Sequence, residues 1–75
     1  MKIRVFIPDY TDIATVNNFN DMYKAMIDGQ LISRPMSNNE LLTLVNDLVI
    51  KGSYEGRVSI DKRLTYVITL EGGQE

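Results

Sequence analysis

The start of the chain alternates between apolar and polar side chains. Over residues 2–7 one alternate set is apolar, namely Ile3, Val5 and Ile7. A period of two predicts a strand with one buried face. Pro8 ends this strand, and residues 8–12 predict a turn in which acidic and hydroxyl side chains bond the local backbone.

Two later segments have the spacing of amphipathic helices. In the first, over residues 17–28, apolar positions recur three and four apart, at Phe19, Met22, Tyr23, Met26 and Ile27. Gly29 suits a left-handed residue at the end of this helix. The second helix begins with a capping box from Ser37 to Glu40, and Gly52 ends it. Its apolar stripe consists of Leu41, Leu44, Val45, Leu48 and Val49.

The last third alternates twice and predicts a hairpin. Val58 and Ile60 share one strand face, and the second strand carries the apolar set Leu64, Tyr66, Ile68 and Leu70. For both sets to face one core, Ile60 should lie opposite Leu64 across a loop at 61–63. The final strand, rich in β-branched and aromatic residues, is expected between the first strand and its hairpin partner.

These elements predict an α+β fold in the order β-α-α-β-β, with a three-stranded antiparallel sheet and two helices packed on one face. At 75 residues the chain has room for one domain. We expect that domain to span residues 1–71 and residues 72–75 to form a flexible tail. A core this small is marginally stable, so a partner or a second copy could add burial, and a homodimer is one arrangement that we consider.

The composition narrows the chemistry. Cysteine and histidine are both absent, which removes thiolate nucleophiles, the usual zinc ligands and the most common proton shuttle. We therefore expect no enzyme, no catalytic residue, no cofactor and no metal. Asp9 and Asp12 supply two carboxylates, but a calcium loop needs more oxygen ligands, so these acids are expected to cap the turn. No apolar run approaches the roughly 20 residues of a membrane span, so we expect a cytoplasmic protein.

Helices on one face of the sheet would leave the other face open. Its side chains would be Lys2, Arg4, Phe6, Arg57, Ser59, Thr65, Val67 and Thr69. Protein interfaces are enriched in such mixtures of aromatic, aliphatic and arginine side chains. We expect a partner to bind Arg4, Phe6, Arg57 and Val67. A second candidate for partner contact is Ile50, on the polar side of the second helix, provided that Leu42 forms a patch with it. The acidic Asp9 and Asp12 are a third candidate.

The leading hypothesis is a non-enzymatic protein-binding module. Small, mildly acidic domains without cysteine are often phage or mobile-element products that bind and block a host protein, anti-CRISPR proteins included. The expected partner is a host enzyme or a nucleic-acid-binding complex. This hypothesis rests on size and composition, with a net charge of −2.

The alternative hypothesis uses the cations of the hairpin. Lys51, Arg57, Lys62 and Arg63, set against the acids Glu55 and Asp61, give residues 51–63 a local charge of +2. The stretch also resembles the recognition helix and wing of MarR-like winged-helix repressors, through Leu41, Leu42, Leu44, Val45, Leu48, Lys51, Gly52, Asp61, Arg63 and residues 67–72. The resemblance implies a small DNA-binding regulator with Asp61 and Arg63 at the wing tip, near the minor groove. The acidic exposed side of the helix disfavours a groove lined by phosphates.

Overall fold

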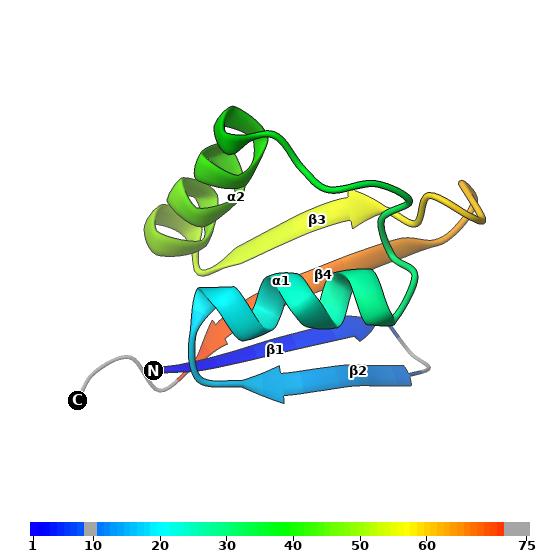
Figure 1. Cartoon of the computed structure of the whole chain (residues 1–75). Helices are drawn as coiled ribbons and strands as arrows, with labels where there is room; N and C mark the ends of the chain where they lie inside the picture. The colour runs from blue at the N-terminus through cyan, green and yellow to red at the C-terminus, as the bar shows by residue number, and fades with distance from the viewer. Residues whose placement is uncertain (9–10, 72–75) are drawn as a thin grey trace.

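The structure is a computed structural model that describes residues 1–8 and 11–71, and it is an α+β fold with a four-stranded antiparallel sheet (Figure 1). The elements are β1 (Lys2–Ile7), β2 (Thr11–Val16), α1 (Phe19–Asp28), α2 (Asn38–Lys51), β3 (Ser53–Arg57) and β4 (Thr65–Glu71). The sheet order is β2-β1-β4-β3, so the first and last strands lie side by side in its middle. The expected tail at 72–75 lies outside the described residues.

The predicted three-stranded sheet was wrong by one strand. Thr11 and Asp12, which were expected to lie in a turn, begin β2, an edge strand paired with β1. A β-bulge hid this strand, because Val5 lies opposite Ala14 and Phe6 lies opposite Asp12, which leaves an extra residue at Ile13. A bulge breaks the period of two on which the prediction depended. The final strand does lie between β1 and β3.

α1 ends at Asp28 with Gly29 as its C-cap, as predicted, but its first residue and the conformation of Gly29 differ from the prediction. Its first helical residue is Phe19, because Asn18 caps the helix and its side chain accepts a 2.8 Å hydrogen bond from the Asp21 amide. At the other end Gly29 has φ −80°, so it is not left-handed. The left-handed residue is Gln30, with φ 60°.

The ends of α2 confirm the prediction. Ser37 and Glu40 form both hydrogen bonds of the capping box, at 3.2 Å and 2.9 Å. The Ser37 amide and the Arg34 guanidinium lower the pKa of the exposed Glu40 carboxyl. Gly52, with φ 81°, ends the helix in the left-handed conformation that glycine adopts at no steric cost.

The predicted hairpin is correct in parity but not in length. Even-numbered residues face each other, since Gly56 lies opposite Tyr66 and Tyr54 lies opposite Ile68. The strands separate earlier than expected, however, and residues 58–64 form the connection. Val58 remains buried, whereas Ile60 is 67% exposed and Leu64 is 37% exposed, so Ile60 and Leu64 lie in the connection and do not face each other in the core.

Both helices cover the same face of the sheet. α1 lies over β1 and β2, and α2 lies over β3 and β4 (Figure 1). One core cluster contains side chains from both helices, the two central strands and two connecting segments: Ile3, Val5, Met22, Met26, Leu31, Leu44, Leu48, Val58, Tyr66 and Ile68. Ile27 and Val49 were expected in this core, but they are 41% and 63% exposed. Over residues 1–8 and 11–71, no helix has the length and apolarity needed to cross a membrane.

Tyr66 gives the fold a dependence on alkaline pH. Its side chain is buried next to Tyr54, with ring centroids 6.3 Å apart. Burial, with Tyr54 adding to it, raises the pKa of Tyr66 to about 12, compared with about 10 for a free tyrosine. The folded state therefore disfavours the phenolate.

We expect stability to fall as the pH rises from about 10 through about 12, because the unfolded chain loses the Tyr66 proton first. Below about pH 10 the protonated Tyr66 makes its full contribution to the stability of the fold. Urea unfolding of the wild type and of Tyr66→Phe, measured across this range, tests the prediction. The phenylalanine variant should lose less stability over the same interval. Equal slopes for the two proteins would contradict it.

Candidate protein-binding surfaces

The face of the sheet opposite the helices is uncovered by any described helix or strand, and we call it the open face. Its middle row runs across all four strands, because Asp12 lies opposite Phe6, Phe6 opposite Val67, and Val67 opposite Glu55. Neither Phe6 nor Val67 belongs to the core cluster or packs against it. The sequence therefore placed both residues on the correct face, and they are adjacent at its centre.

Arg4 organises one end of this row. Its guanidinium lies 4.7 Å from the centre of the Phe6 ring, within the range of a cation–π contact. The same guanidinium donates two hydrogen bonds to Asp12, the shorter of which is 2.7 Å. Arg4, Phe6 and Asp12 thus form one contact group on two adjacent strands. Asp9, the other acid predicted here, lies outside the described residues.

Arg57 lies at the other side of the open face, at the end of β3, where it pairs with Thr65. Its Nη1 donates a 2.7 Å hydrogen bond to the Lys62 carbonyl. This bond spans the connection between the two strands, so Arg57 both closes the hairpin and contributes to the open face. Ser59, which was also expected here, lies beyond the end of the strand, and its amide donates to the Leu31 carbonyl.

Only three of the four cations of the alternative hypothesis lie together, namely Arg57, Lys62 and Arg63 at the connection of the hairpin. Lys51 is the last residue of α2, at the start of β3, whereas Lys62 and Arg63 lie beyond its other end (Figure 1). Arg63 is bound to Asp61 at 3.2 Å, and its side chain and amide lower the pKa of that carboxyl. Arg57 is held by the Lys62 carbonyl. Exposed cations therefore lie at both ends of the hairpin.

The outward side of α2 carries a second apolar surface. Ile50 is 78% exposed, as expected, and Leu42 is 59% exposed. Val49 joins them, although the sequence pattern placed it in the core. The heptad spacing of Leu42 and Val49 places both side chains on the same side of the helix, and this was a sequence signal for the surface. The prediction missed it because Val49 was assigned to the adjacent stripe of core residues.

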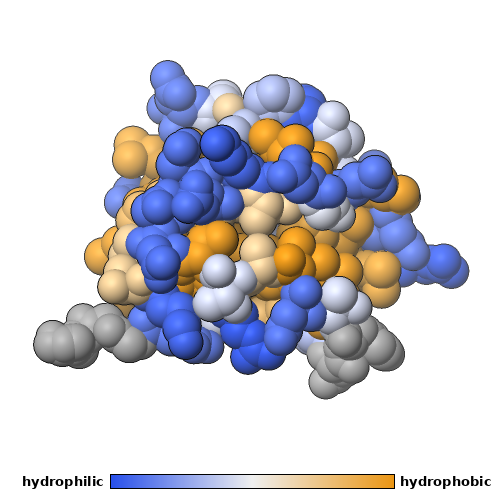
Figure 2. Space-filling view, turned by 60° about the horizontal axis from the view of Figure 1, so that its bottom comes forward, coloured by the Kyte–Doolittle hydropathy of each residue, from blue (hydrophilic) through white to orange (hydrophobic). Residues whose placement is uncertain are grey.

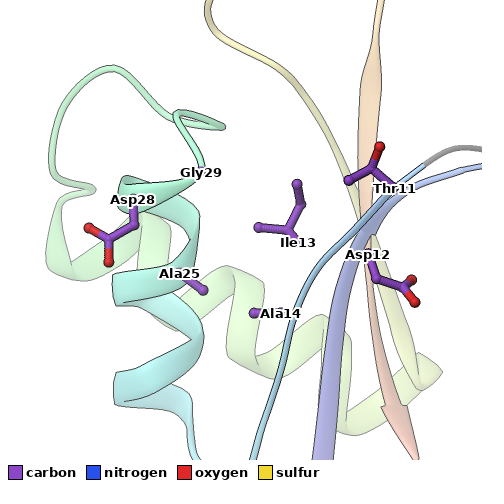
Figure 3. A pocket seen from close by; sticks show the side chains of 7 residues that line it. All are labelled: Thr11, Asp12, Ile13, Ala14, Ala25, Asp28 and Gly29. Atoms are coloured by element: carbon purple, nitrogen blue, oxygen red, sulfur yellow. The ribbon is translucent and has the colours of Figure 1, made fainter.

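A shallow hollow lies between β2 and α1. It encloses about 490 Å³ and is lined by Thr11, Asp12, Ile13, Ala14, Ala25, Asp28 and Gly29. Figure 2, seen from the β2 side, shows apolar surface enclosed by hydrophilic residues. In Figure 3 the side chains of Ile13, Ala14 and Ala25 face the gap, whereas the carboxylates of Asp12 and Asp28 point out of it. The hollow therefore has no convergent polar groups that could orient a ligand.

No metal-ligand cluster is found in the described part of the chain, where no three carboxylates converge. Comparisons with known proteins add no assignment: no family model matches the chain, and neither a curated protein nor a solved structure is similar to it.

Proposed function

We propose that this chain is a non-enzymatic protein-binding module whose open face contacts a protein partner. The observation that carries the proposal is the position of Phe6 and Val67, which are paired at the centre of a sheet face that no described element covers. On an antiparallel sheet with one solvated face, the residues that point to solvent are normally polar. Two adjacent apolar side chains there have no structural role in the core, and a partner would bury them.

The charges around this centre favour protein over nucleic acid as the partner. Arg4 is paired with Asp12 at 2.7 Å, and Val67 has Glu55 as its other neighbour. The open face therefore mixes both signs of charge around an apolar centre, as in protein interfaces with a polar rim. A surface that follows a phosphate backbone needs a single sign. Size and composition favour a phage or mobile-element inhibitor of a host protein, and this narrower role belongs to the same proposal.

The double variant Phe6→Ala with Arg57→Ala should reduce capture of the partner at least tenfold. Aromatic and arginine side chains dominate interface energies, with losses of about 2 kcal/mol or more for each hot spot. The wild type and the variant would be used as baits in the source organism's lysate, and retained proteins quantified by mass spectrometry. The affinity for the recombinant partner would then be measured by calorimetry.

A matched control removes one cation and one apolar side chain from the opposite side of the molecule, through Lys24→Ala and Ile27→Ala on α1. This control should retain the partner. The thermal midpoint of the Phe6 and Arg57 variant should fall only slightly below that of the wild type, because Phe6 is outside the core and the bond from Arg57 to the Lys62 carbonyl is exposed to solvent. Identical capture by both baits would refute the proposal. Capture of DNA that is lost between about 50 and 200 mM salt would instead support the wing hypothesis.

A further inference from the structure

The outer edge of β2 is unpaired in the part of the chain that the structure describes. Its only described neighbour in the sheet is β1, on the inner side. Residues 11–16 make no backbone hydrogen bond with any described turn or loop. An unpaired strand edge presents a row of free amide and carbonyl groups, which is a template for one more strand.

The side chains of β2 do little to protect this edge. Edge strands are commonly guarded by charged residues, and β3, at the other edge, carries Glu55 and Arg57 within five residues. β2 has one charged residue, Asp12, whose carboxylate is bound by Arg4. The bulge at Ile13 interrupts the edge, but residues 14–16 pair regularly with β1. A strand can therefore be added along residues 14–16.

The hollow between β2 and α1 lies beside this edge, on the helix-covered side of the sheet. Ala14, which is paired with the buried Val5, faces it from the strand, and Ala25 faces it from the helix (Figure 3). Its lining has no polar side chains that would orient a ligand, but the backbone of the strand edge would orient a peptide. Side chains alternate between the two faces of a sheet, so the residue of an added strand opposite Ala14 would point into the hollow.

The charges around the hollow indicate what else the added strand carries. The two charged residues of its lining are both acids, Asp12 and Asp28. Asp28 is the last residue of α1, and the last turn of this helix holds no basic residue. The helix dipole disfavours a carboxylate at this end, and none of the ion pairs of the described residues includes Asp28. A cation is therefore the group that complements this end of the hollow.

We infer that the edge of β2 binds an extended peptide segment of a partner protein by strand addition, with an apolar side chain in the hollow and a lysine or arginine at Asp28. Strands that pair across a bulge are rarely parallel, so the added strand runs antiparallel to β2. From Ala14 it proceeds towards Thr11, the end at which Asp28 lies (Figure 3). The cation therefore follows the apolar residue by two positions, on the same side of the strand. The inference does not depend on the open face as a binding surface.

Selection from a display library of random linear peptides about six residues long, the length of a typical strand, tests the inference with the purified chain as bait. Enriched peptides should share an apolar residue followed two positions later by lysine or arginine. A fluorescently labelled enriched peptide should bind the wild type in solution, as measured by anisotropy. Methylation of its central backbone amides should weaken binding at least tenfold, because strand addition depends on main-chain hydrogen bonds.

Two variants of the chain test the hollow and the charge separately. Ala25→Gln fills the hollow and should weaken binding of the labelled peptide at least tenfold, whereas Asn20→Gln, at an exposed position of α1 outside the hollow, should not. Asp28→Lys should also weaken binding at least tenfold, yet it should raise the thermal midpoint, because a cation suits this end of the helix. Asp47→Lys on α2 makes the same change in net charge and should bind the peptide like the wild type.

The inference would be overturned if no peptide were enriched, or if the labelled peptide bound Ala25→Gln and Asp28→Lys as tightly as the wild type. Binding that survives methylation of the peptide backbone would also overturn it, since the peptide would then lie on a surface other than the strand edge. The double variant Phe6→Ala with Arg57→Ala should bind the labelled peptide normally. Failure of this site and failure of the open face are therefore distinguishable.

Discussion

Replacing Gly56 by alanine should lower the free energy of unfolding by about 1–3 kcal/mol, the usual cost of overpacking. Gly56 lies on β3 opposite Tyr66 of β4, and the tyrosine ring covers it. A Cβ atom at Gly56 would lie 2.5 Å from both the Cζ and the hydroxyl oxygen of Tyr66. The ring cannot move aside without exposing its buried surface, since Tyr66 is only 3% exposed.

Urea unfolding of the wild type, Gly56→Ala, Ser53→Ala, Tyr66→Leu and the Gly56→Ala, Tyr66→Leu double variant isolates this contact. Ser53→Ala places an alanine on the same strand at an exposed position and should change stability by no more than about 0.5 kcal/mol. In a Tyr66→Leu background the phenol atoms are gone, so Gly56→Ala should cost less than it does in the wild type. An equal cost in both backgrounds would show that the ring is not the obstacle.

Gly29→Ala should also destabilise the fold, by about 1–2 kcal/mol, although its backbone conformation suits alanine. With φ −80° at Gly29, a helix-terminal alanine would ordinarily be the better residue, by about 0.5–1 kcal/mol. Sterics override this preference, because the new Cβ would lie 2.8 Å from Ile13 Cγ2 and 3.1 Å from the Ala25 carbonyl oxygen. Gly29 therefore allows α1 to approach the bulge of β2.

A double-mutant cycle with Ile13→Ala tests this explanation. Once the Ile13 methyl group is removed, Gly29→Ala should be nearly neutral or stabilising, because only the contact with the Ala25 carbonyl remains. A cost that persists undiminished without the Ile13 side chain would point to the helix end itself. Chemical denaturation of the four proteins at one pH gives the coupling energy.

The fold could be predicted from the sequence wherever a local rule is strict. Ser37 and Glu40 mark the start of α2 in the sequence, and Gly52 marks its end, because capping and the left-handed conformation are short-range effects. β2 was missed because the bulge at Ile13 breaks its alternation, and the bulge depends on how β1 pairs with it. The exposure of Ile27 and Val49 was missed for a related reason, since periodicity gives the direction of a stripe but not its width.

The candidate surfaces also combine features that follow from the local sequence with features that depend on how the strands pair. Alternation alone places Phe6 and Val67 on one face, and the register makes them neighbours. The pairing of Arg4 with Asp12 could not be foreseen, because it needs the unpredicted strand β2. Local charge grouped Lys51 with Lys62, but β3 separates them, since sequence proximity along an extended strand means distance in space.

The strand order has a consequence for how the chain is made. Of the described strands, the two central ones, β1 and β4, are synthesised at the greatest interval from each other, and Lys2 lies opposite Glu71. On a ribosome the early hairpin of β1 and β2 must wait with one edge unpaired until the final strand emerges. Contacts between such distant segments slow folding. Linking the chain after Glu71 to the chain before Lys2, and opening it in the 58–64 connection, would make β4 and β1 consecutive, so such a circular permutant should refold faster than the parent.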